Sequence, residues 1–272
     1  MIGRSPQEIW ARSLADGEVR LRRRTSVLAA TSLLAGFHVM LGLLALVVAT
    51  GALSAVMPAP SAHVLGALTF GVAFVFLTLG RTELFTENFL IPVSTVLAGR
   101  GSKRALARLW SVALVMNLVG IALFAALLAA PGVLQDEAAS AAGDLADTLL
   151  ERSLGAAFLS AVLAGAVITL FTWLTEAAES EVTRVLVSII VGFVLLAPST
   201  NHSIVGFGEV LLGILTGTTP ADALDLLRNL GIAIAGNLVG GVGFVTSARF
   251  VQASEAMGSK PPPEPPAPRP AA

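Results

Sequence analysis

Two apolar segments of this 272-residue chain are each interrupted by a short polar stretch that could do chemistry inside a membrane. The first stretch, residues 80–88, reads Gly-Arg-Thr-Glu-Leu-Phe-Thr-Glu-Asn. The second, residues 198–203, reads Pro-Ser-Thr-Asn-His-Ser. Paired interrupted helices in corresponding halves of a membrane protein point to a transport pathway, because broken backbone at membrane depth is tolerated only inside protein or beside water. We therefore expect the chain to move a small solute across a bilayer.

His202 is the one titratable side chain of the second stretch. A lone histidine in a helix is usually a buried residue bonded to backbone, but this one lies between Asn201 and Ser203 inside a helix break. That position favours a functional role. His38 lies on an uninterrupted apolar run and His63 near the end of another, so we expect both to be structural.

The first stretch carries three charges, and Arg81, Glu83 and Glu87 would each cost about 2.5–3.5 kcal/mol at the centre of a bilayer. The simplest interpretation places the two glutamates toward the cytoplasmic face, where they are solvated or paired. A second hypothesis pairs Arg81 with Glu209, the only other charge deep within an apolar segment.

Composition places the chain in the membrane class. Hydrophobic residues make up 55%, charged residues 13%, and the mean hydropathy is +0.82, whereas a soluble protein carries about 25% charged residues. The absence of cysteine excludes disulfides, thiolate catalysis and cysteine metal sites. We expect no metal, no cofactor and no nucleic-acid partner.

A bilayer core about 30 Å thick needs roughly 20 helical residues to cross it. We predict an all-α integral membrane protein with six transmembrane helices, of which the second and fifth are broken. The four unbroken spans are expected at 27–52, 106–130, 154–175 and 229–251, and the two broken ones at 62–99 and 184–216.

These spans define a transmembrane domain over residues 27–252. Residues 1–26 are predicted to form a cytoplasmic segment in which the capping box 5–8 begins an amphipathic helix on the inner membrane surface. The Pro-rich residues 253–272 are predicted to be a disordered cytoplasmic tail. Most of the 17 Lys and Arg residues lie in these flanks and in the 100–108 loop. Both termini are therefore expected in the cytoplasm, with the protein in a bacterial inner membrane.

An internal repeat supports this topology. The third span contains Asn117-Leu-Val-Gly and the sixth contains Asn237-Leu-Val-Gly. With three spans per half, the repeats, about 27–130 and 154–251, must enter the membrane from opposite sides, as in inverted-repeat transporters. We expect Asn117 and Asn237 to support the site by hydrogen bonding the broken backbone across the interface between the repeats.

Three motifs resemble the formate/nitrite transporter family. They are Glu83-Leu84-Phe85-Thr86 in the first break, Asn201-His202-Ser203-Ile204 in the second, and Gly236-Asn237-Leu238-Val239-Gly240-Gly241 in the last span. The resemblance covers residues 5–252, and the string Leu84-Phe85-Thr86-Glu87-Asn88 is closer to a divergent branch of the family. It implies an aquaporin-like protomer, a pentameric assembly, and passage of small monovalent anions or their conjugate weak acids.

The resemblance also implies roles for individual residues. Thr86 would hydrogen-bond the passing anion and His202 would be the central pore histidine, with Asn201 and Ser203 beside it on the pathway. The implied apolar constrictions are Leu84 and Phe85 on the cytoplasmic side, Phe70 and Phe74 nearer the outside, and Leu195, which stands where the family often has phenylalanine.

The sequence departs from the family pattern at two positions. The family's basic residue near the outer start of the fourth span falls on Leu149, although Arg152 is close by. Its asparagine within that span falls on Gly165. Both family residues concern anion attraction and the surroundings of the histidine, so the departures bear on substrate choice.

The chemistry can be derived from general principles. An anion entering an apolar constriction loses hydration worth far more than one hydrogen bond returns, and transfer as the neutral acid avoids most of that cost. Histidine, with a reference pKa of about 6.5, can hold or release a proton near neutral pH. Burial favours its neutral form, an arriving anion favours the protonated form, and Thr86 could donate from the opposite side.

The sequence therefore favours a channel or transporter for small monovalent anions or weak acids, which pass either alone or together with a proton, in a homo-oligomer within the bilayer. The alternative is an aquaporin-like pore for neutral solutes, although the usual Asn-Pro-Ala triplets are absent. An enzyme is not expected, because no Gly-x-Ser-x-Gly elbow surrounds the serines near His202.

Overall fold

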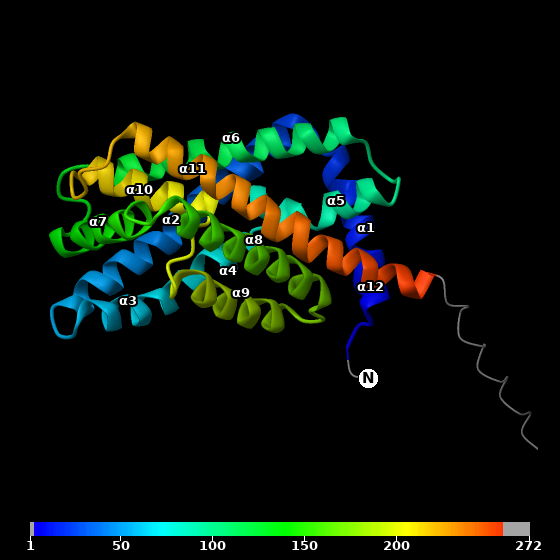
Figure 1. Ribbon diagram of the computed structural model, residues 1–272, viewed down its shortest axis with the longest axis horizontal. Helices are drawn as coiled ribbons and strands as arrows, with labels where there is room; N and C mark the ends of the chain where they lie inside the picture. Colours follow the sequence, from blue (N-terminus) through cyan, green and yellow to red (C-terminus); the bar gives the residue numbers. More distant parts are fainter. Residues whose placement is uncertain (1–2, 258–272) are drawn as a thin grey trace, which may run out of the picture.

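The computed structural model describes residues 3–257, and all regular structure in that range is helical (Figure 1). In chain order the elements are α1 Pro6–Arg22, α2 Thr25–Ser54, α3 Ala59–Ala67, η1 Leu68–Phe70, α4 Gly71–Leu79, η2 Phe85–Phe89, α5 Ile91–Leu97, α6 Lys103–Leu128, α7 Asp136–Leu150, α8 Leu154–Ala177, α9 Glu181–Leu196, α10 Ser203–Thr216, α11 Ala223–Leu238, η3 Val239–Thr246 and α12 Ser247–Met257.

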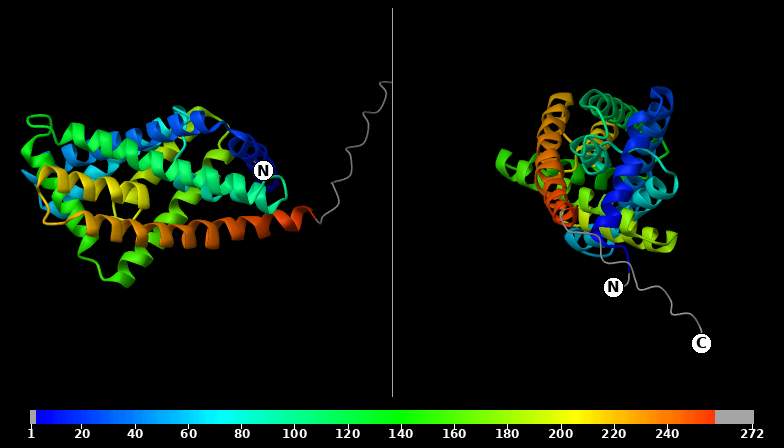
Figure 2. Two further views of the ribbon diagram at one scale, coloured as in Figure 1. Left: turned by 90° about the horizontal axis from the view of Figure 1, so that it is seen from above. Right: turned by 90° about the vertical axis from the view of Figure 1, so that its right-hand side faces the viewer.

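The long helices run roughly along one axis and form a bundle when viewed from its end (Figures 1 and 2). Helices α1 and α12 lie at the same end of this bundle, and α7 lies at the opposite end (Figure 1). Helix α5 lies toward the α1 end, whereas α10 lies toward the α7 end. The half-helices that follow the two breaks therefore occupy opposite halves of the molecule.

Five helices of the described chain are long and apolar enough to cross a bilayer: Thr25–Ser54, Ala59–Leu79, Lys103–Leu128, Leu154–Ala177 and Ala223–Ala253. Three of the four predicted unbroken spans fall within them, and the predicted span 106–130 extends two residues past the end of its helix at Leu128. The first break does not divide its apolar segment into equal halves. The helix before it, Ala59–Leu79, is long enough to span a bilayer, and only the short α5 follows it. The second break does separate two short helices, α9 and α10, of 16 and 14 residues.

The last long helix changes its winding where it passes the first break. Residues Val239–Thr246 form a π-helix rather than an α-helix. Gly241 lies so close to this break that an added Cβ would meet Cδ2 of Phe89 at 2.7 Å. Thr246 Oγ1 also donates to the Phe89 carbonyl at 2.8 Å. Wider π-turns are frequent at functional sites, and here they fit the helix against η2.

The predicted capping box begins α1 as expected. Ser5 Oγ accepts from the Glu8 N–H at 3.3 Å, and the Glu8 carboxylate accepts from the Ser5 N–H at 2.7 Å. These two bonds satisfy backbone donors that the first turn of a helix leaves free.

The apolar face of α1 was predicted to lie on the membrane surface, and this is wrong for residues 9–14. Ile9, Trp10 and Leu14 are buried in a cluster with Leu90 and Trp173. The apolar face covers α5 and α8 instead, because burial against protein removes the same apolar surface from water. At the other terminus, the first five residues of the predicted tail continue α12, and the remainder of 253–272 lies outside the described residues.

Candidate functional site

The two helix breaks have the same backbone structure. Arg81 and Ser199, with φ angles of 51° and 50°, are the only residues other than glycine with positive φ in the described chain. In each break the next N–H donates to the carbonyl five residues back, at 3.2 Å from Thr82 and 3.3 Å from Thr200. This left-handed ending with a six-to-one bond is a Schellman motif, which ends a helix and satisfies one of its last carbonyls.

Asn117 of α6 stabilises the first break. Its Oδ1 accepts from the Phe85 N–H at 2.8 Å, and its Nδ2 donates to the Glu83 carbonyl at 3.0 Å. The same Nδ2 donates to the Ser32 carbonyl of α2 at 2.7 Å. One buried amide therefore satisfies backbone groups that the break leaves without helical partners.

Asn237 of α11 makes the same bonds at the second break. Its Oδ1 accepts from the Ser203 N–H at 2.8 Å, and its Nδ2 donates to the Asn201 carbonyl at 3.1 Å. In each break one residue lies between the two bonded positions. That residue is Leu84 in the first break and His202 in the second. The expected hydrogen bonding of the broken backbone is confirmed, but its expected direction is wrong, because each asparagine bonds the break in its own half of the chain rather than the break in the other half. The effect of these bonds on transport stays a prediction.

The two breaks meet at one polar contact. Thr86 Oγ1 and His202 Nε2 lie 2.9 Å apart, and both side chains are fully buried. His202 is also the N-cap of α10, where its Nδ1 accepts from the Val205 N–H at 3.2 Å. A nitrogen that accepts this bond carries no proton, so the ring is neutral, holds its proton on Nε2 and donates it to Thr86. The Thr86 hydroxyl proton has no acceptor among the described residues.

The neighbours of His202 differ in how their polar groups are used. Asn201 and Asn229 exchange two amide hydrogen bonds, of 2.9 and 3.3 Å, so the Asn201 side chain is engaged within the protein. Ser203 Oγ is buried and has no hydrogen-bond partner in the described part of the chain. Of the two, Ser203 is better placed to serve a passing solute.

The predicted apolar constriction residues are all buried in the main core. Phe74 stacks on Phe171 of α8 at a centroid distance of 4.9 Å, a contact that the sequence did not reveal. Phe85 packs edge-on against Phe89 at 5.1 Å. The others in this core are Phe70, Leu84 and Leu195.

A cavity of about 610 Å³ opens beside the first break, between α1, α4, α8 and α9. Glu83 and Glu87, which flank Thr86 in the sequence at distances of three and one residues, both line it. Its remaining charged lining comprises Arg12, Asp16, Arg20, Arg23, Arg81, Glu176 and Arg184. The cavity is thus lined by five arginines and four carboxylates, and it reaches the segment that carries Thr86.

The hypothesis of an Arg81–Glu209 pair is wrong. Arg81 is exposed and lines the cavity near α1. Glu209 is only 3% exposed on α10, and the charge that acts on it is Arg152. The half-helices α5 and α10 lie toward opposite ends of the bundle (Figure 1), and Glu209 lies on α10 whereas Arg81 lies at the cavity beside α1.

Residues 7–251 match the formate/nitrite transporter family, which covers both breaks and every long helix. The chain belongs to this family. The formate/nitrite transporter homologue is therefore a multi-pass membrane protein and a transporter rather than an enzyme.

Curated relatives of this homologue come from distant organisms. It is 25% identical over 248 residues to the inner membrane protein YfdC of Escherichia coli, covering 90% of this chain and 78% of that protein. It is 27% identical over 259 residues to a probable formate transporter of Methanothermobacter thermautotrophicus, covering 89% of this chain and 94% of the relative.

Two solved structures share its fold. An FNT family ion channel superposes with a TM-score of 0.80 at 20% identity, covering 90% of this chain and 98% of that one. A pentameric formate channel with formate bound superposes with a TM-score of 0.70 at 21% identity, covering 84% and 97%.

The Gly165 departure has a steric cause in this homologue. A Cβ at Gly165 would meet Cα of Asn237 at 2.5 Å. An asparagine there would push α11 away from α8 and displace the amide that holds the second break.

The Leu149 departure is accompanied by a different use of basic charge. Leu149 is 2% exposed and packs in an apolar cluster. Arg152 Nη1 donates to Ser160 Oγ at 2.9 Å, and that oxygen accepts from the Asn201 N–H at 3.1 Å. Sequence reasoning noticed Arg152 but missed Ser160 and Asn229, for which the available signal was a polar residue on an otherwise apolar helix.

Proposed function

We propose that this formate/nitrite transporter homologue conducts small monovalent anions, or their conjugate weak acids, past Thr86 and His202. The observation that carries the proposal is the 2.9 Å contact between these two buried side chains, one from each helix break. Family membership supports the substrate class, and one structural relative is described as a formate channel.

The architecture that goes with this function is two inverted three-helix repeats with six spans, the second and fifth broken. The identical backbone bonding of the two breaks supports it, because Asn117 and Asn237 each hold equivalent donors and acceptors. The position of α1 and α12 at one end of the bundle supports placing both termini in the cytoplasm (Figure 1). The pentameric relative supports a homopentamer, and the contact of Thr86 with His202 within one chain supports a separate pathway in each protomer.

Electrostatics favour an anion along this route. The cavity before the first break is lined by five arginines and four carboxylates, so it has an excess of one positive charge. The N-terminus of α10 then presents its positive end where His202 caps it. Leu84 and Leu195, both fully buried, keep bulk water away from the contact.

The ring geometry favours hydrogen-bond donation by His202. With Nδ1 accepting from Val205, the neutral ring can turn its Nε2–H from Thr86 to an anion, while the Thr86 hydroxyl donates its own proton. Protonation of Nδ1 would break the helix cap and place a cation at the positive end of α10. A fully charged imidazolium therefore requires an anion already beside it.

Flux through the purified protein in liposomes tests this function. Formate, nitrite, acetate and chloride uptake are measured for the wild type, Thr86→Val and His202→Asn, and solute swelling assays test the neutral-solute alternative. Removal of a hydrogen bond to an ion should cost about 1.5–3 kcal/mol, or roughly 10- to 100-fold in flux.

His38→Asn is the matched control, because His38 bonds Thr82 at 3.2 Å and does not reach the contact. It should leave anion selectivity unchanged. Equal flux of every anion through wild type, Thr86→Val and His202→Asn would refute the proposed pathway.

A further inference from the structure

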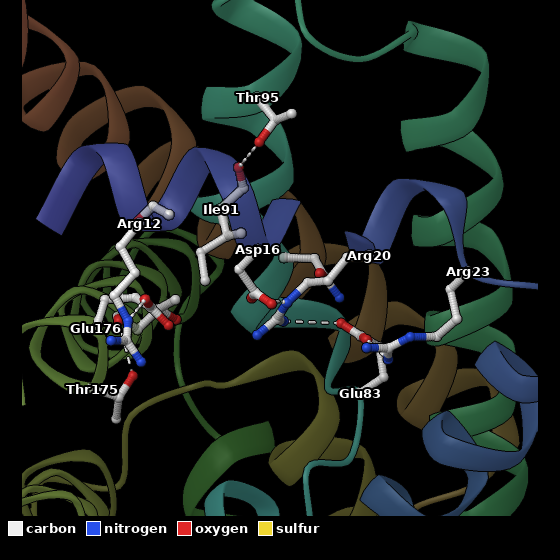
Figure 3. Close-up of polar contacts among 12 residues, drawn as sticks. Arg12, Asp16, Arg20, Arg23, Glu83, Ile91, Thr95, Thr175 and Glu176 are labelled. Carbon is white, nitrogen blue, oxygen red and sulfur yellow. Dashed lines mark hydrogen bonds and ion pairs between the residues drawn. The ribbon is translucent and has the colours of Figure 1, made fainter. Parts of the chain in front are cut away.

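Glu83 is an almost fully buried carboxylate held by two arginines of the N-terminal region. Its side chain is 2% exposed, and Arg20 Nη1 of α1 donates to its Oε1 at 3.0 Å. Arg23, just after α1, donates to the other oxygen, Oε2. Figure 3 shows the carboxylate between these two guanidinium groups. Asp16 in turn bonds Arg20 at 2.7 Å, which fixes the Arg20 side chain.

The backbone of Glu83 is fixed as well. Its N–H donates to the Thr31 carbonyl of α2 at 3.3 Å, and its carbonyl accepts from Asn117. Asn117 also holds the Phe85 N–H, and Thr86 follows directly. Glu83 is therefore connected, through three residues of chain and the shared Asn117 amide, to the hydroxyl that contacts His202.

Helix α1, which carries Arg20, is held in place by further contacts with α8 and α5. Arg12 of α1 pairs with Glu176 of α8 at 3.0 Å (Figure 3). Gly17 packs so tightly on α5 that an added Cβ would meet the Ile91 carbonyl at 2.9 Å. Helix α1 is thus held in place by contacts that do not involve the break.

The second break has a brace at the equivalent place with different chemistry. Arg152 lies two residues before α8, as Arg23 lies two residues before α2. Arg152 acts on Asn201 through Ser160, whereas Arg23 acts on Glu83 directly. An arginine therefore supports each break. Side-chain contacts, and not only the helix caps, hold these two segments in position.

We propose that Glu83 is a positioning residue of the conduction path, through which α1 holds Thr86 in contact with His202. The inference rests on the proposed function for its transport readout and on the local structure for its second readout. Glu83 touches no solute itself and acts through Thr86.

Formate flux in liposomes and hydrogen exchange by mass spectrometry are measured on the full chain as wild type, Glu83→Gln, Thr86→Val and the double variant. Glu83→Gln should lower the maximal formate flux about tenfold, with a smaller change in the half-saturating concentration, because misplacement of an interacting group chiefly slows passage. It should also speed exchange across residues 84–90. In the Thr86→Val background it should cause no further loss of flux, because residues acting through one another are non-additive.

Glu18→Gln is the matched control, since Glu18 lies on α1 and makes only partly exposed pairs with Arg22 and Arg100, at 3.9 and 3.7 Å. It should leave flux and exchange at wild-type values. Wild-type flux and exchange in Glu83→Gln would overturn the proposal, and so would an equal loss of flux with and without Thr86. If the wild type passed no formate, the proposed function would fail, while faster exchange in Glu83→Gln alone would still uphold the bracing of Thr86.

Discussion

Replacement of Asn237 by alanine should destabilise the protein more than any exposed substitution on the same helix. The change leaves the Ser203 N–H and the Asn201 carbonyl without the amide that now bonds them at 2.8 and 3.1 Å. Both residues are fully buried, so water does not reach these groups. Asn237→Asp keeps an acceptor for Ser203 but loses the donor and sets a negative oxygen against a carbonyl.

The magnitude follows from the number of groups left unpaired. A buried donor or acceptor without a partner costs about 1–3 kcal/mol. Two such groups predict a loss of roughly 2–6 kcal/mol in the free energy of unfolding. Asn237→Asp should lose at least as much free energy of unfolding as Asn237→Ala.

The free energy of unfolding is measured in mixed micelles titrated with SDS, with tryptophan fluorescence as the signal. Val239→Ala is the control, because Val239 is 50% exposed on the same helix and such changes usually stay within about 0.5 kcal/mol. A loss for Asn237→Ala no larger than that of the control would show that the amide does not brace the break.

Three further changes have defined outcomes. Gly165→Ala should destabilise the protein by about 1–3 kcal/mol in the same assay, because its Cβ overlaps the backbone of α11. Trp110→Phe removes the donor to the Asn88 carbonyl at 3.1 Å and should cost about 1 kcal/mol, detectable as a lower unfolding midpoint. Hydrogen bonds from the capping box lower the pKa of Glu8, so its contribution to α1 is present above the ordinary carboxyl pKa and is lost as pH falls through the lowered value; amide exchange of the first turn of α1 should accelerate only on acidification, and Glu8→Gln should abolish that pH dependence.

The spans were predictable because each depends on composition within one segment. The apolar runs around α2, α6 and α8 exceed the length that a bilayer requires, and turn chemistry and polar residues located both breaks. Asn117 and Asn237 were found for the same reason, since a polar amide in an apolar helix must have a partner. The positive φ of Arg81 and Ser199 had no such signal, because neither residue is glycine or asparagine.

The contacts that the sequence missed depend on which segments meet in space. Arg20 and Glu83 are 63 residues apart, and nothing local to either predicts their pairing. The Arg81–Glu209 hypothesis failed because it considered how deep each residue lies in its apolar segment. It did not consider the side of the membrane from which each segment enters. The apolar face of α1 was placed on lipid because periodicity shows that a face is apolar and not what covers it.

The two breaks share one backbone structure. The amide bonds that hold each kink therefore do not involve the side chain at its centre. Leu84 and His202 occupy corresponding slots in kinks that the same amide bonds hold, and only His202 adds a cap of its own. Under the proposed function, exchange of the residue in either slot would keep the amide bonds of the kink while changing how many ionisable groups an ion on that pathway meets. On that proposal, a point substitution in one of these slots changes which solutes pass without altering the helices on either side of the kink.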